Sequence, residues 1–204
     1  MAAGLGTDAV VHIRTDAHGR MDVRELERMC AEMQADAAHP QGVPLIVCAT
    51  SGTTVLGAFD DVAAIAEVCR KYNLWLHVDA SWGGAAAFLP HDAPERSVLA
   101  GLENAHSITI NPHKLLGVTH QCSFLLVHDK SVLIPPSHSD GGYLFHVPAE
   151  DALDMATKTL GCGRRGDALK FYLVWLRYGT QGLGDHIAHG LRICLLYTSD
   201  AADE

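Results

Sequence analysis

Three short segments combine residues that could do chemistry with a position directly after an apolar run. They are Ala-Thr-Ser-Gly-Thr-Thr at 49–54, Asp-Ala-Ser-Trp-Gly-Gly at 79–84 and Asn-Pro-His-Lys at 111–114. A lysine in a partly desolvated pocket, here Lys114, can attack an aldehyde and form a Schiff base. A nearby carboxylate, here Asp79, can keep a pyridine nitrogen protonated and so strengthen the ring as an electron sink. With His113 and the hydroxyls of Thr54 and Ser81, the set is the one that a pyridoxal phosphate enzyme requires.

Each of these residues also has an ordinary structural role when it is taken alone. Asp79 could cap a helix or form a turn, Lys114 could be a solvated surface charge, and Thr54 is a common turn residue. Their joint placement after three predicted strands favours the catalytic interpretation, because open α/β sheets bind ligands at the carboxyl ends of their strands.

The elements that would position these segments alternate between strand and helix. Apolar runs predict strands at 8–13, 43–49, 74–78, 107–110 and 122–127. The strand at 43–49 is apolar on both faces, which predicts helices on both sides of it. Asp22, with Glu25 three residues on, predicts a helix start, and a second helix is predicted from Asp60 to Asn73. A last helix is expected from Asp167 to Tyr178, with Gly179 in the C′ position.

The composition excludes several classes of protein. The chain has 204 residues, 48% of them hydrophobic and 19% charged, so it can build a sizeable core. Its formal net charge of −9 and the lack of a basic tract argue against nucleic-acid and anionic-membrane surfaces. Apolar runs such as 43–49 are too short to span a bilayer, and residues 1–6 do not resemble a secretory signal.

The cysteines and histidines predict neither disulfides nor a metal site. The six cysteines are scattered without a Cys-x-x-Cys pair, which is typical of reduced thiols and predicts a cytoplasmic protein. The thirteen histidines include His186 and His189 at helical spacing, but no acidic residue or cysteine joins them at ligand spacing. We therefore expect no metal and a soluble α/β domain.

With their neighbours, these segments resemble the group II pyridoxal-phosphate-dependent amino-acid decarboxylases, nearest to the glutamate and cysteine sulfinic acid decarboxylase branch. The resemblance covers roughly residues 4 to 191. Its motifs are Val-Asp-Ala-Ser-Trp-Gly-Gly (78–84), Asn-Pro-His-Lys (111–114), Ala-Thr-Ser-Gly-Thr-Thr-Val-Leu-Gly-Ala-Phe-Asp (49–60), Gly-Tyr-Leu-Phe (142–145), Cys-Gly-Arg-Arg (162–165) and Lys-Phe-Tyr-Leu-Val-Trp (170–175).

The resemblance implies a cofactor, pyridoxal 5′-phosphate, and a role for each matching residue. Lys114 would carry the cofactor as a Schiff base, and Asp79 would pair with its ring nitrogen. Thr54 and Ser81 fall on positions that contact the ring, although relatives more often have alanine at the latter. His113 would lie beside the cofactor phosphate or the substrate.

The resemblance also implies a homodimer. Tyr143 matches a tyrosine on a mobile catalytic loop, which protonates the carbanion left after carbon dioxide departs. In the family this loop reaches into the active site of the partner subunit. After Tyr143 the sequence departs from the family, with Leu-Asp-Met-Ala-Thr-Lys at 153–158 where relatives usually show Leu-Asp-Thr-Gly-Asp-Lys.

The fold implied is α/β, an incomplete large domain of the fold-type I transferase class, with a mostly parallel sheet flanked by helices. Residues 1–192 would be the C-terminal part of this cofactor-binding domain. Residues 193–204 do not continue the family pattern, and we interpret them as a non-native tail. The family's ring-stacking histidine, phosphate loop and small domain would lie outside these 204 residues, so we expect the fragment alone to be inactive.

The function implied is α-decarboxylation of an acidic amino acid: glutamate, cysteine sulfinate or aspartate. Two alternatives stay open, namely an aromatic amino-acid decarboxylase and an inactive, binding-only fragment that pairs with an intact subunit. Arg164 or Arg165 could meet a substrate carboxylate, and a structural salt bridge is an equal interpretation.

Overall fold

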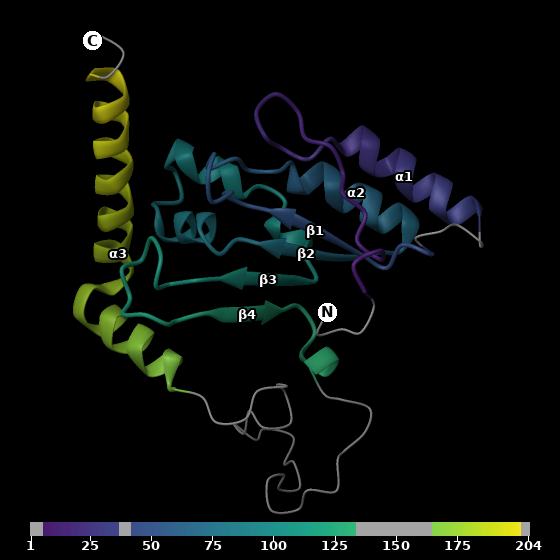
Figure 1. Ribbon diagram of the computed structural model, residues 1–204. Coiled ribbons are helices and arrows are strands. Elements are labelled where there is room, and N and C mark those ends of the chain that lie inside the picture. Colours follow the sequence, from purple (N-terminus) through teal and green to yellow (C-terminus); the bar gives the residue numbers. More distant parts are fainter. Residues whose placement is uncertain (1–5, 37–41, 134–164, 201–204) are drawn as a thin grey trace, which may run out of the picture.

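A four-stranded sheet forms the centre of the computed structural model (Figure 1). The structure describes residues 6–36, 42–133 and 165–200, with side chains up to residue 193. The strands lie in the order β1-β2-β3-β4, where β1–β3 are parallel and β4 is antiparallel to β3. Their bounds are Ile46–Thr50 for β1, Trp75–Asp79 for β2, Ser107–Ile110 for β3 and Phe124–Val127 for β4. The predicted α/β class with a mostly parallel sheet is therefore confirmed.

Two helices pack on the sheet near β1 and β2, and local signals set their ends. Helix α1 spans Val23–Ala35, and its N-cap Asp22 accepts hydrogen bonds from the backbone N–H groups of Arg24 and Glu25. Helix α2 spans Val62–Tyr72 and ends at Asn73, which adopts the left-handed conformation with φ of 52°. The predicted ends at Asp22 and Asn73 are thus confirmed.

The third helix lies at the side of the sheet toward which β1–β3 point (Figure 1). Helix α3 spans Asp167–Asp200 and contains a kink at Gly179, whose φ of 66° and ψ of 177° are not helical. The predicted helix break at Gly179 is confirmed, but the chain resumes a helical course beyond it. In the described ranges, 3-10 helices occupy four connections, at Gly83–Phe88, Pro94–Leu99, Leu102–Asn104 and Lys130–Leu133.

The strand predicted at 8–13 is wrong. Within the described ranges these residues pair with no strand, and the nearest bridge joins Thr15 to Met21. Ile13 packs its side chain against the core, whereas Val10 is exposed. An apolar pattern alone does not make a strand, because a strand also needs a neighbour for its backbone hydrogen bonds.

The strand predicted at 43–49 begins later and is covered less than expected. β1 starts at Ile46, after Pro44, which has no N–H for a sheet ladder. Val47 and Ala49 are buried, whereas Ile46 and Cys48 on the opposite face are exposed. In the described part of the chain, helices therefore cover one face of β1, and the prediction of cover on both faces is wrong.

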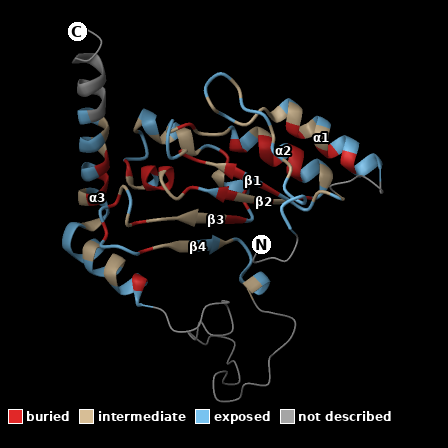
Figure 2. Cartoon of the chain, in the orientation of Figure 1, coloured by how far each residue is buried: buried red, intermediate tan, exposed pale blue. Residues whose placement is uncertain are grey.

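Two apolar clusters hold the elements together. Figure 2 shows buried residues along α2, β1 and β2. The larger lies between the sheet and α1 and α2, and its most enclosed side chains include Ile65, Leu76 and Val78, all 0% exposed. The smaller joins the 3-10 helix at Gly83–Phe88 to α3, through side chains such as Leu183. The second cluster fixes the segment after β2 in place. Among the described residues, no helix is long and apolar enough to cross a membrane.

Candidate active site

Backbone hydrogen bonds bring the three chemistry-bearing segments together at the carboxyl edge of the sheet. The N–H of Ser51 donates to the carbonyl of Asp79 at 2.8 Å, and the N–H of Gly83 donates to the carbonyl of Ser51 at 3.1 Å. The N–H of Asn111 donates to the carbonyl of Ser81 at 3.3 Å, which joins the second segment to the third. The adjacency expected from the order of strands is therefore present in the structure.

Asp79 is the last residue of β2, and its side chain is exposed at this edge. One carboxylate oxygen, Oδ1, accepts a hydrogen bond from the backbone N–H of Ser81 at 2.9 Å. This short turn fixes the carboxylate relative to the half-buried Ser81. The charge of Asp79 also reaches Cys48 on β1. Although Cys48 is exposed, partial desolvation of its thiol, and then this charge, raise the pKa of the thiol above its usual value.

Lys114 and His113 lie in a tight turn directly after β3. The N–H of Lys114 donates to the carbonyl of Asn111 at 2.9 Å, and the Lys114 side chain is exposed. His113 is half-buried, and its Nδ1 lies 2.6 Å from the carbonyl oxygen and 3.1 Å from the backbone nitrogen of Cys122. Because Nδ1 is occupied in this way, Nε2 is the ring atom through which His113 would meet a ligand.

The loop after β1 is held by Thr53 rather than by Thr54. The hydroxyl of Thr53 accepts a hydrogen bond from the N–H of Ala58 at 2.9 Å, whereas Thr54 is exposed on the rim. Gly52 has a φ of 92°, and a Cβ there would lie 2.8 Å from the indole of Trp82. The loop therefore approaches the Trp82 turn more closely than a residue with a side chain would allow.

The remaining candidates are placed as follows. Tyr143 and Arg164 lie outside the described residues. Arg165 is exposed. Among the described residues, no group of three His, Cys, Asp or Glu side chains could hold a metal ion.

Sequence reasoning missed Asp60, which lies behind the site. Its two carboxylate oxygens accept hydrogen bonds from the backbone N–H groups of Met21, at 2.6 Å, and of Thr50, at 2.7 Å. The neighbouring Asp61 is the N-cap of α2 and accepts from Ala64, so the prediction that Asp60 begins this helix is wrong by one residue. The adjacent Asp60 and Asp61 are the sequence signal that could have indicated this role. One carboxylate suffices to cap a helix, so the other is available for a different set of hydrogen bonds.

Two buried polar atoms at this edge have no hydrogen-bond partner among the described residues: Oγ of Ser51 and Oδ1 of Asn111. An unpartnered buried polar atom is costly, so such atoms mark places where a further group would be accommodated. Both belong to the segments that carry Thr54 and Lys114. Gly83 adds to the close packing, because a Cβ there would overlap the ring of Phe59 and the carbonyl of Ser51.

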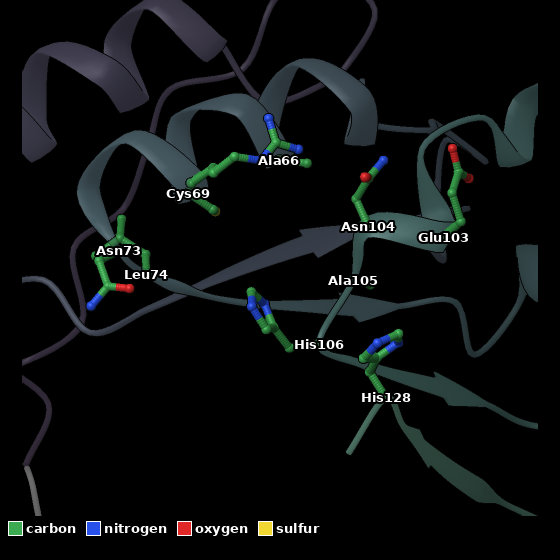
Figure 3. Close-up of a pocket in the computed structure, with 10 residues that line it drawn as sticks. Ala66, Cys69, Asn73, Leu74, Glu103, Asn104, Ala105, His106 and His128 are labelled. Atoms are coloured by element: carbon green, nitrogen blue, oxygen red, sulfur yellow. The ribbon is translucent and has the colours of Figure 1, made fainter.

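A separate pocket of about 330 Å³ lies at the opposite end of the sheet (Figure 3). It is lined by the end of α2 and by residues that flank β3 and β4, including Asn73, His106 and His128. His106 precedes β3, so this pocket faces the amino end of that strand. It is therefore distinct from the edge that carries Asp79 and Lys114.

Comparisons with known proteins agree on one family. A family model described as the pyridoxal-dependent decarboxylase conserved domain matches residues 1–201. The chain is 46% identical over 183 residues to human cysteine sulfinic acid decarboxylase, covering 88% of this chain and 36% of that protein. It is 42% identical over 194 residues to L-aspartate decarboxylase from Metarhizium robertsii, covering 95% of this chain and 37% of that protein.

A solved structure agrees with these sequence matches. The crystal structure of mouse CSAD matches with a TM-score of 0.84 and 41% identity, covering 98% of this chain and 40% of that one. The chain thus spans between 36% and 40% of the length of these three relatives.

Proposed function

This chain belongs to the pyridoxal-dependent decarboxylase family and has the α/β architecture of the fold-type I class, and from that premise we propose that the protein decarboxylates an acidic amino acid with pyridoxal phosphate. The observation that carries the proposal is the set of backbone hydrogen bonds that joins the segments of Ser51, Asp79 and Asn111 at one sheet edge. Those bonds bring a carboxylate, hydroxyls and a lysine-bearing turn into one place.

The residues at this edge fit the cofactor. The buried, unpartnered oxygens of Ser51 and Asn111 call for a polar group beside them. Lys114, exposed at the turn after β3, would attach the cofactor through its amine. Bound there, pyridoxal phosphate would supply an electron-withdrawing ring that stabilises negative charge at the α-carbon of the substrate.

The chain's own residues would then divide the work. The Asp79 carboxylate would hold the proton of the ring nitrogen by charge and hydrogen bonding, and the turn to Ser81 would keep the carboxylate in place. His113, anchored through Nδ1, presents Nε2 to the cofactor phosphate or the substrate. Thr54 and Ser81 would contact the ring. Tyr143 would return a proton to the α-carbon as general acid.

We propose an acidic substrate: glutamate, cysteine sulfinate or aspartate. The matched relatives named for cysteine sulfinic acid and L-aspartate decarboxylation support this choice. We further propose a homodimer in which the segment of Tyr143 serves the partner's site, and a cytoplasmic location, which agrees with the free thiols of Cys30, Cys48 and Cys69.

A substrate panel tests this proposal. The full-length product of the gene that encodes this chain is supplied with pyridoxal phosphate, and carbon dioxide release is measured from glutamate, cysteine sulfinate, aspartate and dihydroxyphenylalanine. We expect release from at least one acidic substrate and little from dihydroxyphenylalanine. A preference for dihydroxyphenylalanine would indicate an aromatic amino-acid decarboxylase instead. Cofactor binding without any release would indicate a binding-only protein.

A further inference from the structure

A line of polar side chains runs beneath Asp79 on the face of the sheet opposite α1 and α2. Trp75, His77 and Asp79 alternate along β2, so their side chains project from the same face. Ser107 and Thr109 project beside them from β3, because the register pairs His77 with Ser107 and Asp79 with Thr109. The five side chains therefore form two adjoining rows that end at the candidate active site.

Three hydrogen bonds connect these rows. Nε1 of Trp75 lies 2.9 Å from Oγ of Ser107, and Nδ1 of His77 lies 2.8 Å from the same oxygen. Nε2 of His77 lies 3.3 Å from Oγ1 of Thr109. Both ring nitrogens of His77 are thus engaged with hydroxyls of the neighbouring strand.

The directions of these bonds follow from the donors available. The indole N–H of Trp75 can only donate, so Oγ of Ser107 accepts from it. Ser107 is 6% exposed, and Nδ1 of His77 is the acceptor that the described residues offer to its hydroxyl proton. Since a buried hydroxyl without an acceptor is costly, Ser107 donates to Nδ1 of His77. Nε2 then carries the ring proton and donates to Oγ1 of Thr109.

The series of hydrogen bonds from Trp75 to Thr109 ends beside Asp79, and this end indicates what the series does. Once Oγ1 of Thr109 accepts from His77, its hydroxyl proton must point elsewhere, and its neighbour across the strands is Asp79. Oδ1 of Asp79 already accepts from Ser81, which leaves Oδ2 for a further donor. We propose that His77 is a positioning residue that turns the Thr109 hydroxyl toward Asp79, and so holds this carboxylate in place for the cofactor ring nitrogen. The inference rests on the proposed function of the site.

The start of the series is fixed as well. The ring of His106 stacks on the indole of Trp75, with centroids 4.9 Å apart, and Nδ1 of His106 accepts the backbone N–H of Leu76 at 2.9 Å. These contacts fix the position of the Trp75 indole. Because the indole N–H donates to Ser107, they also fix the direction in which the Ser107 hydroxyl donates its own proton. A side chain at position 77 that accepts a hydrogen bond from Ser107 but donates none to Thr109 would interrupt this series of hydrogen bonds between Ser107 and Thr109.

Paired variants of the full-length protein test this inference. Gln places an amide N–H near the position of Nε2, whereas Asn reaches Ser107 but falls short of Thr109. We measure the Kd for pyridoxal phosphate and the visible absorbance band of the bound cofactor for His77→Gln, His77→Asn and His77→Phe. We expect Asn and Phe to weaken cofactor binding about tenfold and to shift the band, and Gln to stay near the wild type. The exposed His91→Asn serves as the matched control.

If the His77 variants do not fold, a second pair of variants at Thr109 tests the same inference. Thr109→Val removes the hydroxyl at constant shape and should repeat the effect of His77→Asn, whereas Thr109→Ser should not. Equal cofactor binding by Gln, Asn and Phe variants, or by Val and Ser variants, would overturn the positioning role while the proposed function stands. A wild-type protein that binds no pyridoxal phosphate would overturn the proposed function, and this inference with it.

Discussion

Replacement of Asp60 by alanine should destabilise the fold much more than the same change at its neighbour Asp61. The Asp60 carboxylate accepts two short hydrogen bonds, from the backbone N–H groups of Met21 and Thr50, at 2.6 and 2.7 Å. Both bonds are partly buried, and together they join the turn before α1 to the end of β1. Asp61 accepts one exposed bond, from Ala64 at the start of α2.

The magnitudes follow from the number and burial of these bonds. A hydrogen bond to a charged group contributes about 1.5–3 kcal/mol, so the loss of both at Asp60 should cost about 3–6 kcal/mol. Asp60→Asn keeps one acceptor oxygen and should lose about half as much. Asp61→Ala removes an N-cap, which should cost about 1 kcal/mol.

Equilibrium unfolding in urea measures these differences. With a slope of about 2 kcal/mol per molar, Asp60→Ala should lower the urea midpoint by about 2 M. Asp61→Ala should lower it by about 0.5 M. The prediction is above all one of rank: the urea midpoint should fall most for Asp60→Ala, less for Asp60→Asn and least for Asp61→Ala. If the two alanine variants unfold at the same urea concentration, the carboxylate does not join these segments and the reasoning fails.

Three further predictions concern packing, charge and thiol reactivity. Gly83→Ala should lower stability by about 2 kcal/mol because its Cβ has no space, whereas Gly166→Ala, where the nearest atom is 3.8 Å away, should change thermal unfolding little. The Arg28 side chain first, and Arg14 as well, lower the pKa of Glu25 to about 2 from 4.5, so its stabilising effect is present above about pH 4.5 and is lost toward pH 2. Glu25→Gln should therefore be less stable than the wild type at pH 7 and equal to it at pH 2, and equal stability at both would contradict this pairing. Burial, with a smaller effect of Cys30, raises the pKa of Cys69 to about 11, so iodoacetamide should label Cys69 only on unfolding. Rapid labelling of Cys69 itself in the native protein at pH 8, located by peptide mapping, would refute its burial.

Features set by local chemistry could be predicted from the sequence. Asp22 caps α1, Asn73 ends α2 in the left-handed conformation, and Gly179 breaks α3, each because of interactions within a few residues. The strand at 107–110 has the predicted bounds, since its run is short and bounded by turns. The three segments of the candidate site could be found for the same reason: each directly follows such a strand.

Features that depend on pairing between distant segments could not be predicted. The alternation at 8–13 has the appearance of a strand, but the described structure offers its backbone no partner. Whether Asp60 or Asp61 caps α2 depends on Met21, which lies 39 residues away from Asp60. The engagement of His77 with Ser107 requires the register of β2 and β3, and no local pattern encodes that register.

The most direct test of the account asks whether Lys114 attaches the cofactor. The full-length protein is incubated with pyridoxal phosphate, reduced with borohydride, digested, and mapped by mass spectrometry. The account predicts a pyridoxyl group on Lys114, its loss in Lys114→Arg, and its persistence in Lys71→Arg, where a surface lysine paired with Glu27 is changed instead. A folded protein that carries no label on Lys114, or that carries it on another lysine, would contradict the assignment of this sheet edge as the active site.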